Sequence, residues 1–135
     1  MLKVNLIQFG QPWSRTTEQG LAEYQKRLSK VCQFSWQQDA STKELSQWLS
    51  DSKIKVLALD RKGASMTSKA LATQFQAWMT QGISQVVLLM GPSPVPIDSS
   101  LALSPVQLSG EVASVLAAEQ LYRAFRILNH QPYHK

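Results

Sequence analysis

Residues 54–59 read Ile-Lys-Val-Leu-Ala-Leu, a run that is apolar apart from Lys55. Such a run is typical of a strand covered on both faces, because neither face is left to polar side chains. Val86 to Met90 is a second run of this kind and contains no polar residue. Strands buried on both faces occur in parallel sheets, whose strands are connected by helices. These two runs therefore predict an α/β fold.

The segments around these runs alternate between strand and helix patterns. We expect further strands at 2–9, 31–36 and 101–103, and helices at 43–50 and 68–80. Another helix is expected after the break at Gly10-Gln11-Pro12, with Thr16 to Gln19 as a capping box. This alternation predicts a mostly parallel sheet with helices on both faces. The chain shows no internal repeat and no linker, so residues 1–135 are expected to form a single domain.

Composition narrows the class of protein. The chain has 135 residues, of which 44% are hydrophobic, and a net charge of +5, which favours nucleic acid or another polyanion as a partner. Cys32 is the single cysteine, and its apolar neighbours predict a buried, inert thiol. The apolar patch at the N-terminus is too short for a signal peptide, and no run reaches membrane-spanning length. We therefore expect a cytoplasmic protein with no membrane partner.

Three segments follow predicted strands, where ligands bind in open α/β sheets. They are 59–63, 90–94 and 103–108. A simpler interpretation also exists, because Leu59 ends a buried strand and Gly91-Pro92 reads as an ordinary turn. The sequence contains no P-loop and no dinucleotide fingerprint. His130 and His134 follow the expected helix end and lack the accompanying Glu of a zinc motif, so we expect no metal.

The C-terminal residues 116–135 read LAAEQLYRAFRILNHQPYHK and predict a helix followed by a basic, aromatic tail. Glu119 and Arg123 have the i,i+4 spacing of an ion pair. Asn129 is the expected helix stop. From Gln120 onward there is no Asp or Glu, so the tail either meets an anionic partner or is merely solvated.

The string EQLYRAF, followed by PYHK at the terminus, resembles the signature of the RlmH family. That family belongs to the SPOUT class of knotted methyltransferases. The N-terminal strand, VLALDRKG and AWMTQG extend the resemblance along the chain. It implies transfer of a methyl group from S-adenosylmethionine to N3 of a pseudouridine in 23S ribosomal RNA of the ribosome. It also implies a C-terminal trefoil knot and a homodimer.

The resemblance assigns roles to particular residues. The catalytic centre is expected at His134, Tyr133 and Arg123, with His134 assisting loss of the imide proton and Tyr133 stacking on a base. Arg126 and Lys135 are expected to contact RNA phosphates. The residues expected to bind the methyl donor are Leu59, Met90, Gly91, Leu103, Ser104, Pro105, Val106, Gln107 and Leu108.

Two motifs depart from the family pattern. The loop after the fourth strand usually reads Gly-Gly-Pro-x-Gly, whereas this chain has residues 90–94 as Met-Gly-Pro-Ser-Pro. The family's Pro-His pair, and the Arg four residues after the His, correspond to Ser109, Gly110 and Ser114. Three alternatives to an ordinary enzyme of this family follow. They are a diverged, non-enzymatic RNA- or ribosome-binding relative that has lost donor binding, an enzyme with a changed RNA substrate, and a site rebuilt around these residues.

Overall fold

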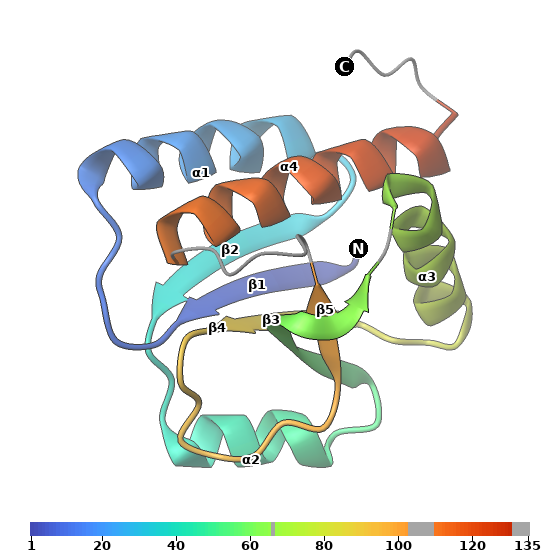
Figure 1. The fold of residues 1–135 in the computed structure, drawn as a ribbon. Helices are drawn as coiled ribbons and strands as arrows, with labels where there is room; N and C mark the ends of the chain where they lie inside the picture. Colours follow the sequence, from blue (N-terminus) through green and yellow to red (C-terminus); the bar gives the residue numbers. More distant parts are fainter. Residues whose placement is uncertain (66, 103–109, 131–135) are drawn as a thin grey trace.

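The computed structural model describes residues 1–65, 67–102 and 110–130. Its strands form one parallel sheet in the order β2-β1-β4-β3-β5 (Figure 1). The strands are β1 Lys3–Gln8, β2 Gln33–Gln38, β3 Ile54–Ser65, β4 Gln85–Met90 and β5 Ser100–Ala102. The predicted α/β fold is therefore confirmed. The trefoil knot stays a prediction, because residues 103–109 lie outside the described residues.

Helices cover both faces of the sheet, as predicted (Figure 1). They are α1 Arg15–Leu28, α2 Thr42–Ser50, α3 Ser68–Thr80 and α4 Gly110–Leu128. The helices α1, α3 and α4 share one core with the sheet, in which Leu6, Phe75 and Leu121 are at most 1% exposed. On the other face, Leu45 of α2 packs with Ile7 of β1. Burying a side chain of this size contributes about 1.5–3 kcal/mol, so both layers stabilise the sheet.

The start of α1 differs from the prediction. Its N-cap is Ser14, whose hydroxyl accepts a hydrogen bond from the Thr17 amide at 3.2 Å, so the predicted capping box at Thr16 to Gln19 is wrong. A capping box is present in α2 instead, where Ser41 and Glu44 hydrogen-bond each other's backbone amides at 3.1 and 3.3 Å. Both caps satisfy amides that lack a partner within the helix.

Strand β3 is longer than the sequence predicts. It continues past Leu59 to Ser65, with a register shift against β5 between Leu59 and Ala64. Gly63 permits this path, because a Cβ at that position would come within 2.7 Å of the Leu101 nitrogen. The segment 59–63 is therefore an irregular part of a strand, and the loop expected there is not formed.

Candidate functional site

Because the strands are parallel, their carboxyl ends lie at one edge of the sheet. Leu59 in β3 and Met90 at the end of β4 both lie near this edge, since the preceding residues Ala58 and Leu89 are register partners. Leu59 is partly buried and Met90 is 2% exposed, and both belong to the core beneath α4. The other expected donor-binding residues at 103–108, namely Leu103, Ser104, Pro105, Val106, Gln107 and Leu108, lie outside the described residues.

Gly91 turns the chain at the end of β4. Its φ is +85°, which is favourable for glycine and strained for other residues. A Cβ at this position would also come within 2.6 Å of the Phe9 carbonyl oxygen. The glycine is exposed, so its backbone is accessible to a ligand at this edge. The turn requires glycine whether or not a ligand binds.

Met90 points into the protein, beneath the first turns of α4. Its Sδ lies 3.2 Å from the hydroxyl oxygen of Ser114, which is fully buried. That hydroxyl donates to the Gly110 carbonyl oxygen at 2.6 Å and accepts from Trp13 Nε1 at 2.7 Å. Met90, Ser114 and Trp13 therefore form a closed contact between β4, α4 and the segment that precedes α1. The Met90 side chain is therefore buried and does not project from the exposed turn at Gly91.

Gly110, the first residue of α4, lies against the end of β1. A Cβ at this position would come within 2.8 Å of the Gln8 Cδ. Gln8 is 2% exposed; its Nε2 donates to the Gln11 carbonyl, while its Oε1 has no hydrogen-bond partner. The Gln8 amide therefore fills the space into which a side chain at 110 would project. We call Gln8, Trp13, Met90, Gly110 and Ser114 the packed cluster.

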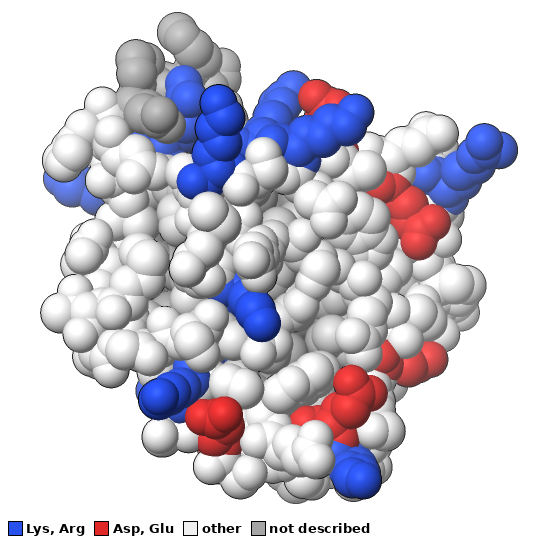
Figure 2. All heavy atoms as spheres, turned by 180° about the vertical axis from the view of Figure 1, so that it is seen from behind, with Lys and Arg blue, Asp and Glu red and all other residues white. Residues whose placement is uncertain are grey.

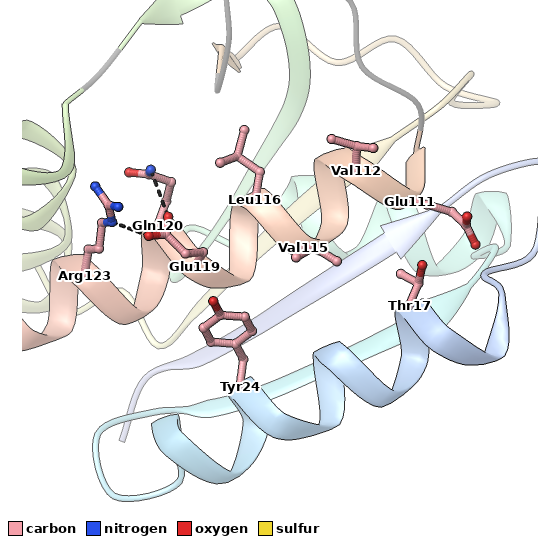
Figure 3. A pocket seen from close by; sticks show the side chains of 9 residues that line it. All are labelled: Thr17, Tyr24, Glu111, Val112, Val115, Leu116, Glu119, Gln120 and Arg123. Carbon is pink, nitrogen blue, oxygen red and sulfur yellow. Dashed lines mark hydrogen bonds and ion pairs between the residues drawn. The ribbon is translucent and has the colours of Figure 1, made fainter. Parts of the chain in front are cut away.

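A groove of about 640 Å³ lies between α1 and the outer side of α4 (Figure 3). Val112, Val115 and Leu116 of α4 line it, and the Tyr24 ring projects from α1 toward α4. Val112 is 53% exposed. The rest of the lining is polar and consists of Thr17, Glu111, Glu119, Gln120 and Arg123. An apolar floor with a polar rim is typical of a protein-binding surface.

Arg123 lies on the rim of this groove and forms the predicted ion pair with Glu119. The Gln120 side-chain amide also donates to Glu119, at 3.2 Å. The two charged side chains are 30% and 25% exposed, so the pair is partly shielded from water. The predicted ion pair is therefore confirmed, and the role of Arg123 in catalysis stays a prediction.

The helix α4 ends where the sequence predicts. The Asn129 side chain donates to the Phe125 carbonyl at 2.9 Å, and the backbone turns at His130, whose φ is +53°. Arg126 lies in the last turn of the helix. The other residues expected to contact RNA, Tyr133, His134 and Lys135, lie outside the described residues.

Other chemistries find little support in the part of the chain that the structure describes. Cys32 is 1% exposed, and burial raises the pKa of its thiol to about 12, which confirms a buried and unreactive group. No cluster of three or more His, Cys, Asp or Glu side chains suited to a metal occurs among the described residues. Within the same residues, no helix combines the length and the apolar character that crossing a membrane requires.

Comparison with known proteins identifies a family that matches this chain. A family described as "Predicted SPOUT methyltransferase" matches residues 2–134. Ribosomal RNA large subunit methyltransferase H 1 of Thermoanaerobacter sp. (strain X514) is 33% identical over 115 residues, which cover 85% of this chain and 86% of that protein. Ribosomal RNA large subunit methyltransferase H of Nitrosococcus oceani is 31% identical, and the alignment covers 99% of both chains. The namesake protein of Protochlamydia amoebophila is 29% identical over the full length of both.

Proposed function

We propose the function of this chain from the family to which it belongs, the SPOUT methyltransferases. The protein transfers a methyl group from S-adenosylmethionine to N3 of a pseudouridine in the large-subunit ribosomal RNA, in the cytoplasm. The observation that carries the proposal is the family match over residues 2–134. The names of the relatives supply the ribosomal RNA as the class of substrate.

The described residues at the carboxyl edge of the sheet support a site for S-adenosylmethionine there. Adenine requires an apolar wall and backbone groups at its edge. Leu59 offers a partly buried apolar side chain, and Gly91 offers exposed backbone at the same edge of the sheet. The donor supplies the electrophilic methyl group. The Met90 side chain is packed beneath α4, which supports the proposal that it does not obstruct the donor.

The RNA side of the reaction is assigned to the last helix and the tail. N3 of pseudouridine carries an imide proton that must leave before methylation, and we assign its acceptance to the imidazole of His134, a side chain that often serves as a general base. Tyr133 stacks on a base, while Arg123, Arg126 and Lys135 hold phosphates. Holding the base near the donor supplies much of the rate enhancement.

Methyl transfer from tritium-labelled S-adenosylmethionine to ribosomes that lack the modification tests this function. We expect turnover by the whole chain and a strong loss of turnover after removal of residues 132–135. Calorimetric titration of both proteins with S-adenosylmethionine is the matching control. A whole chain that shows neither donor binding nor methyl transfer would refute the proposal and favour a non-enzymatic relative.

The groove between α1 and α4 is proposed as the interface of a symmetric homodimer. Of the apolar residues of α4, Ala118, Leu121 and Phe125 are used in the chain's own core, whereas Val112, Val115 and Leu116 line the groove. A closed dimer with two-fold symmetry buries one such patch against its copy. It would also allow the tail of one subunit to complete the site of the other.

Light scattering at micromolar concentration tests the dimer. Val112→Lys places a charge on the proposed interface and is expected to give a monomer. Leu49→Lys is the matched control, because Leu49 is 46% exposed on α2, away from the groove. A monomeric mass for the unmodified protein would contradict the proposal.

A further inference from the structure

Two arginines meet at one tyrosine ring where α1 and α4 end side by side. The guanidinium carbon of Arg27 lies 5.8 Å from the centroid of the Tyr122 ring, and that of Arg126 lies 5.6 Å from the same centroid. Arg27 also lies 5.6 Å from the centroid of Tyr24, whose ring packs against Tyr122 at 6.1 Å. Distances of this size are typical of cation–π contacts. The rings therefore hold two like charges near each other.

A small cavity lies between these cations. Its volume is about 130 Å³, and Arg27, Arg126 and Tyr122 line it together with the apolar side chains of Leu28, Val31 and Phe125. One water molecule takes roughly 30 Å³ of liquid, so the cavity has room for a tetrahedral oxyanion. An apolar floor lowers the local dielectric and strengthens the attraction between an anion and the guanidinium groups.

The carboxylate near Arg27 does not neutralise the site. Glu23 lies 3.5 Å from Arg27 Nε, and both side chains are at least half exposed, so water weakens the pair. Lys26 lies in the last turn of α1 and Lys30 just beyond its end, while Arg123 and Arg126 lie on the last turns of α4. Near the ends of these two helices, the Lys and Arg side chains, with Arg27, therefore outnumber the acidic side chains of Glu23 and Glu119. Figure 2 shows several Lys and Arg side chains gathered along the upper rim of the molecule, over the layer formed by these helices.

We propose that Arg27 and Arg126, held by Tyr122, form a clamp for one phosphate of the RNA backbone. The guanidinium group is suited to this role because its planar donors pair with two phosphate oxygens. The clamp rests on the proposed function, since it assumes an RNA substrate. It adds α1 to the RNA-binding surface, and it lies where α4 leads into the proposed tail. Arg27 and Tyr122 are positioning residues and take no part in the chemical step.

Binding to large ribosomal subunits that lack the modification, measured against salt concentration, tests the clamp. Arg27→Gln should weaken binding by about tenfold and reduce the slope of log affinity against log salt by about 0.7–0.9, the loss of one phosphate contact. Arg27→Lys should keep the salt slope and recover part of the affinity. Arg15→Gln is the matched control, because Arg15 is exposed at the opposite end of α1. The loss in Arg27→Gln should appear mainly in the KM for ribosomes, whereas Arg15→Gln should leave both the KM and the methyl-transfer rate unchanged.

A second pair of variants tests the ring. Tyr122→Phe keeps the π face and should bind like the unmodified protein, whereas Tyr122→Leu should lose affinity as Arg27→Gln does. Urea unfolding of the two Tyr122 variants shows whether a loss of ribosome affinity is caused by a loss of stability. If Arg27→Gln and Arg15→Gln have equal affinities and salt slopes, the clamp does not exist. If the unmodified chain neither binds ribosomes nor transfers methyl groups, the proposed function itself fails.

Discussion

The two ends of α4 lie in opposite surroundings. At its N-terminal end, Gly110 and Ser114 depart from the family pattern, and the structure packs them against Gln8, Trp13 and Met90. At its C-terminal end the family signature EQLYRAF is kept, and its charged side chains lie beside an open groove and a cavity. This difference means that the positions at the N-terminal end of α4 serve packing in this chain, whereas those at the C-terminal end remain available to a partner.

This comparison bears on the alternatives that the sequence leaves open. If Met90, Gly110 and Ser114 were simple losses, the structure would show space for the family residues. It shows the reverse, because Ser114 is fully buried and the Gln8 amide occupies the room next to Gly110. We therefore expect a site rebuilt around these residues, and variants that restore the family residues test this expectation. Restoring the family residues should harm the protein, and the harm should rank by how deeply each residue is buried.

The largest effect is expected for Ser114→Arg. The guanidinium would replace a fully buried hydroxyl that bonds Trp13 Nε1 and the Gly110 carbonyl, and neither of these described partners is acidic. A buried charge without compensation lowers the free energy of unfolding by about 3–5 kcal/mol. Urea unfolding measures it, with Ser46→Arg on the exposed side of α2 as the control. Equal stability of the two variants would show that the packed cluster is open to water.

Met90→Gly comes next. Removing a buried methionine side chain leaves a cavity, and truncations of this kind lower the free energy of unfolding by about 2–5 kcal/mol. Because the side chain points beneath α4, its removal should not tighten binding of S-adenosylmethionine in a calorimetric titration. Met90→Leu conserves volume and should change stability by less than about 1.5 kcal/mol. Tighter donor binding by Met90→Gly would show that the methionine obstructs the donor site.

The sequence predicts the elements of this fold well because their signals are local. The apolar runs at 54–59 and 86–90 indicate strands covered on both faces, and Ser68–Thr80 is a helix with the predicted bounds. The ion pair of Glu119 with Arg123 follows in the same way from spacing along one helix. Each of these predictions depends on residues that are neighbours in the chain.

The packed cluster could not be predicted in this way. Trp13 and Ser114 are 101 positions apart, and no periodicity links them. One signal was present, since Gln8 is a polar residue at the end of a strand that is otherwise mostly apolar. Its meaning depends on Gly110, whose missing side chain leaves room for the amide. Likewise, the apolar run predicts a strand end at Leu59, whereas Gly63 lets β5 approach closely and the strand continues to Ser65.

Gly110→His should have an intermediate effect that depends on Gln8. A side chain at 110 meets the Gln8 amide, and overpacking of this kind lowers the free energy of unfolding by about 1–3 kcal/mol. Gln8→Ala removes the obstacle, so the double variant should be more stable than the sum of the single effects by about 0.5–3 kcal/mol. A double-mutant cycle in urea measures this coupling.

Gly20 provides the control for that cycle. A Cβ at Gly20, in the middle of α1, would meet no atom within 4 Å. Gly20→His should therefore be tolerated and should show no coupling to Gln8→Ala. If Gly110→His and Gln8→Ala were also additive, the Gln8 amide and position 110 would not compete for space, and the compensation inferred for the N-terminal end of α4 would be wrong.

The smallest effect is expected at an exposed link between the helices. Glu111 accepts a hydrogen bond from the Ser14 amide at the start of α1, and this bond lowers the pKa of the Glu111 carboxyl below its ordinary value of 4.5. A carboxyl whose pKa is lowered in the folded state stabilises the protein at every pH above its ordinary pKa. This stabilisation is lost as the pH falls through the lowered pKa of the folded state.

Glu111→Gln should therefore be less stable than the unmodified protein at neutral pH, and the difference should vanish in acid. Thermal unfolding between pH 2 and pH 7 measures it, and Glu18→Gln, in the first turn of α1, matches the change in charge without breaking the link. If the difference in stability between Glu111→Gln and the unmodified protein persisted at pH 2, Glu111 would act through packing. The charge of its carboxylate would then contribute nothing to the link between α4 and α1.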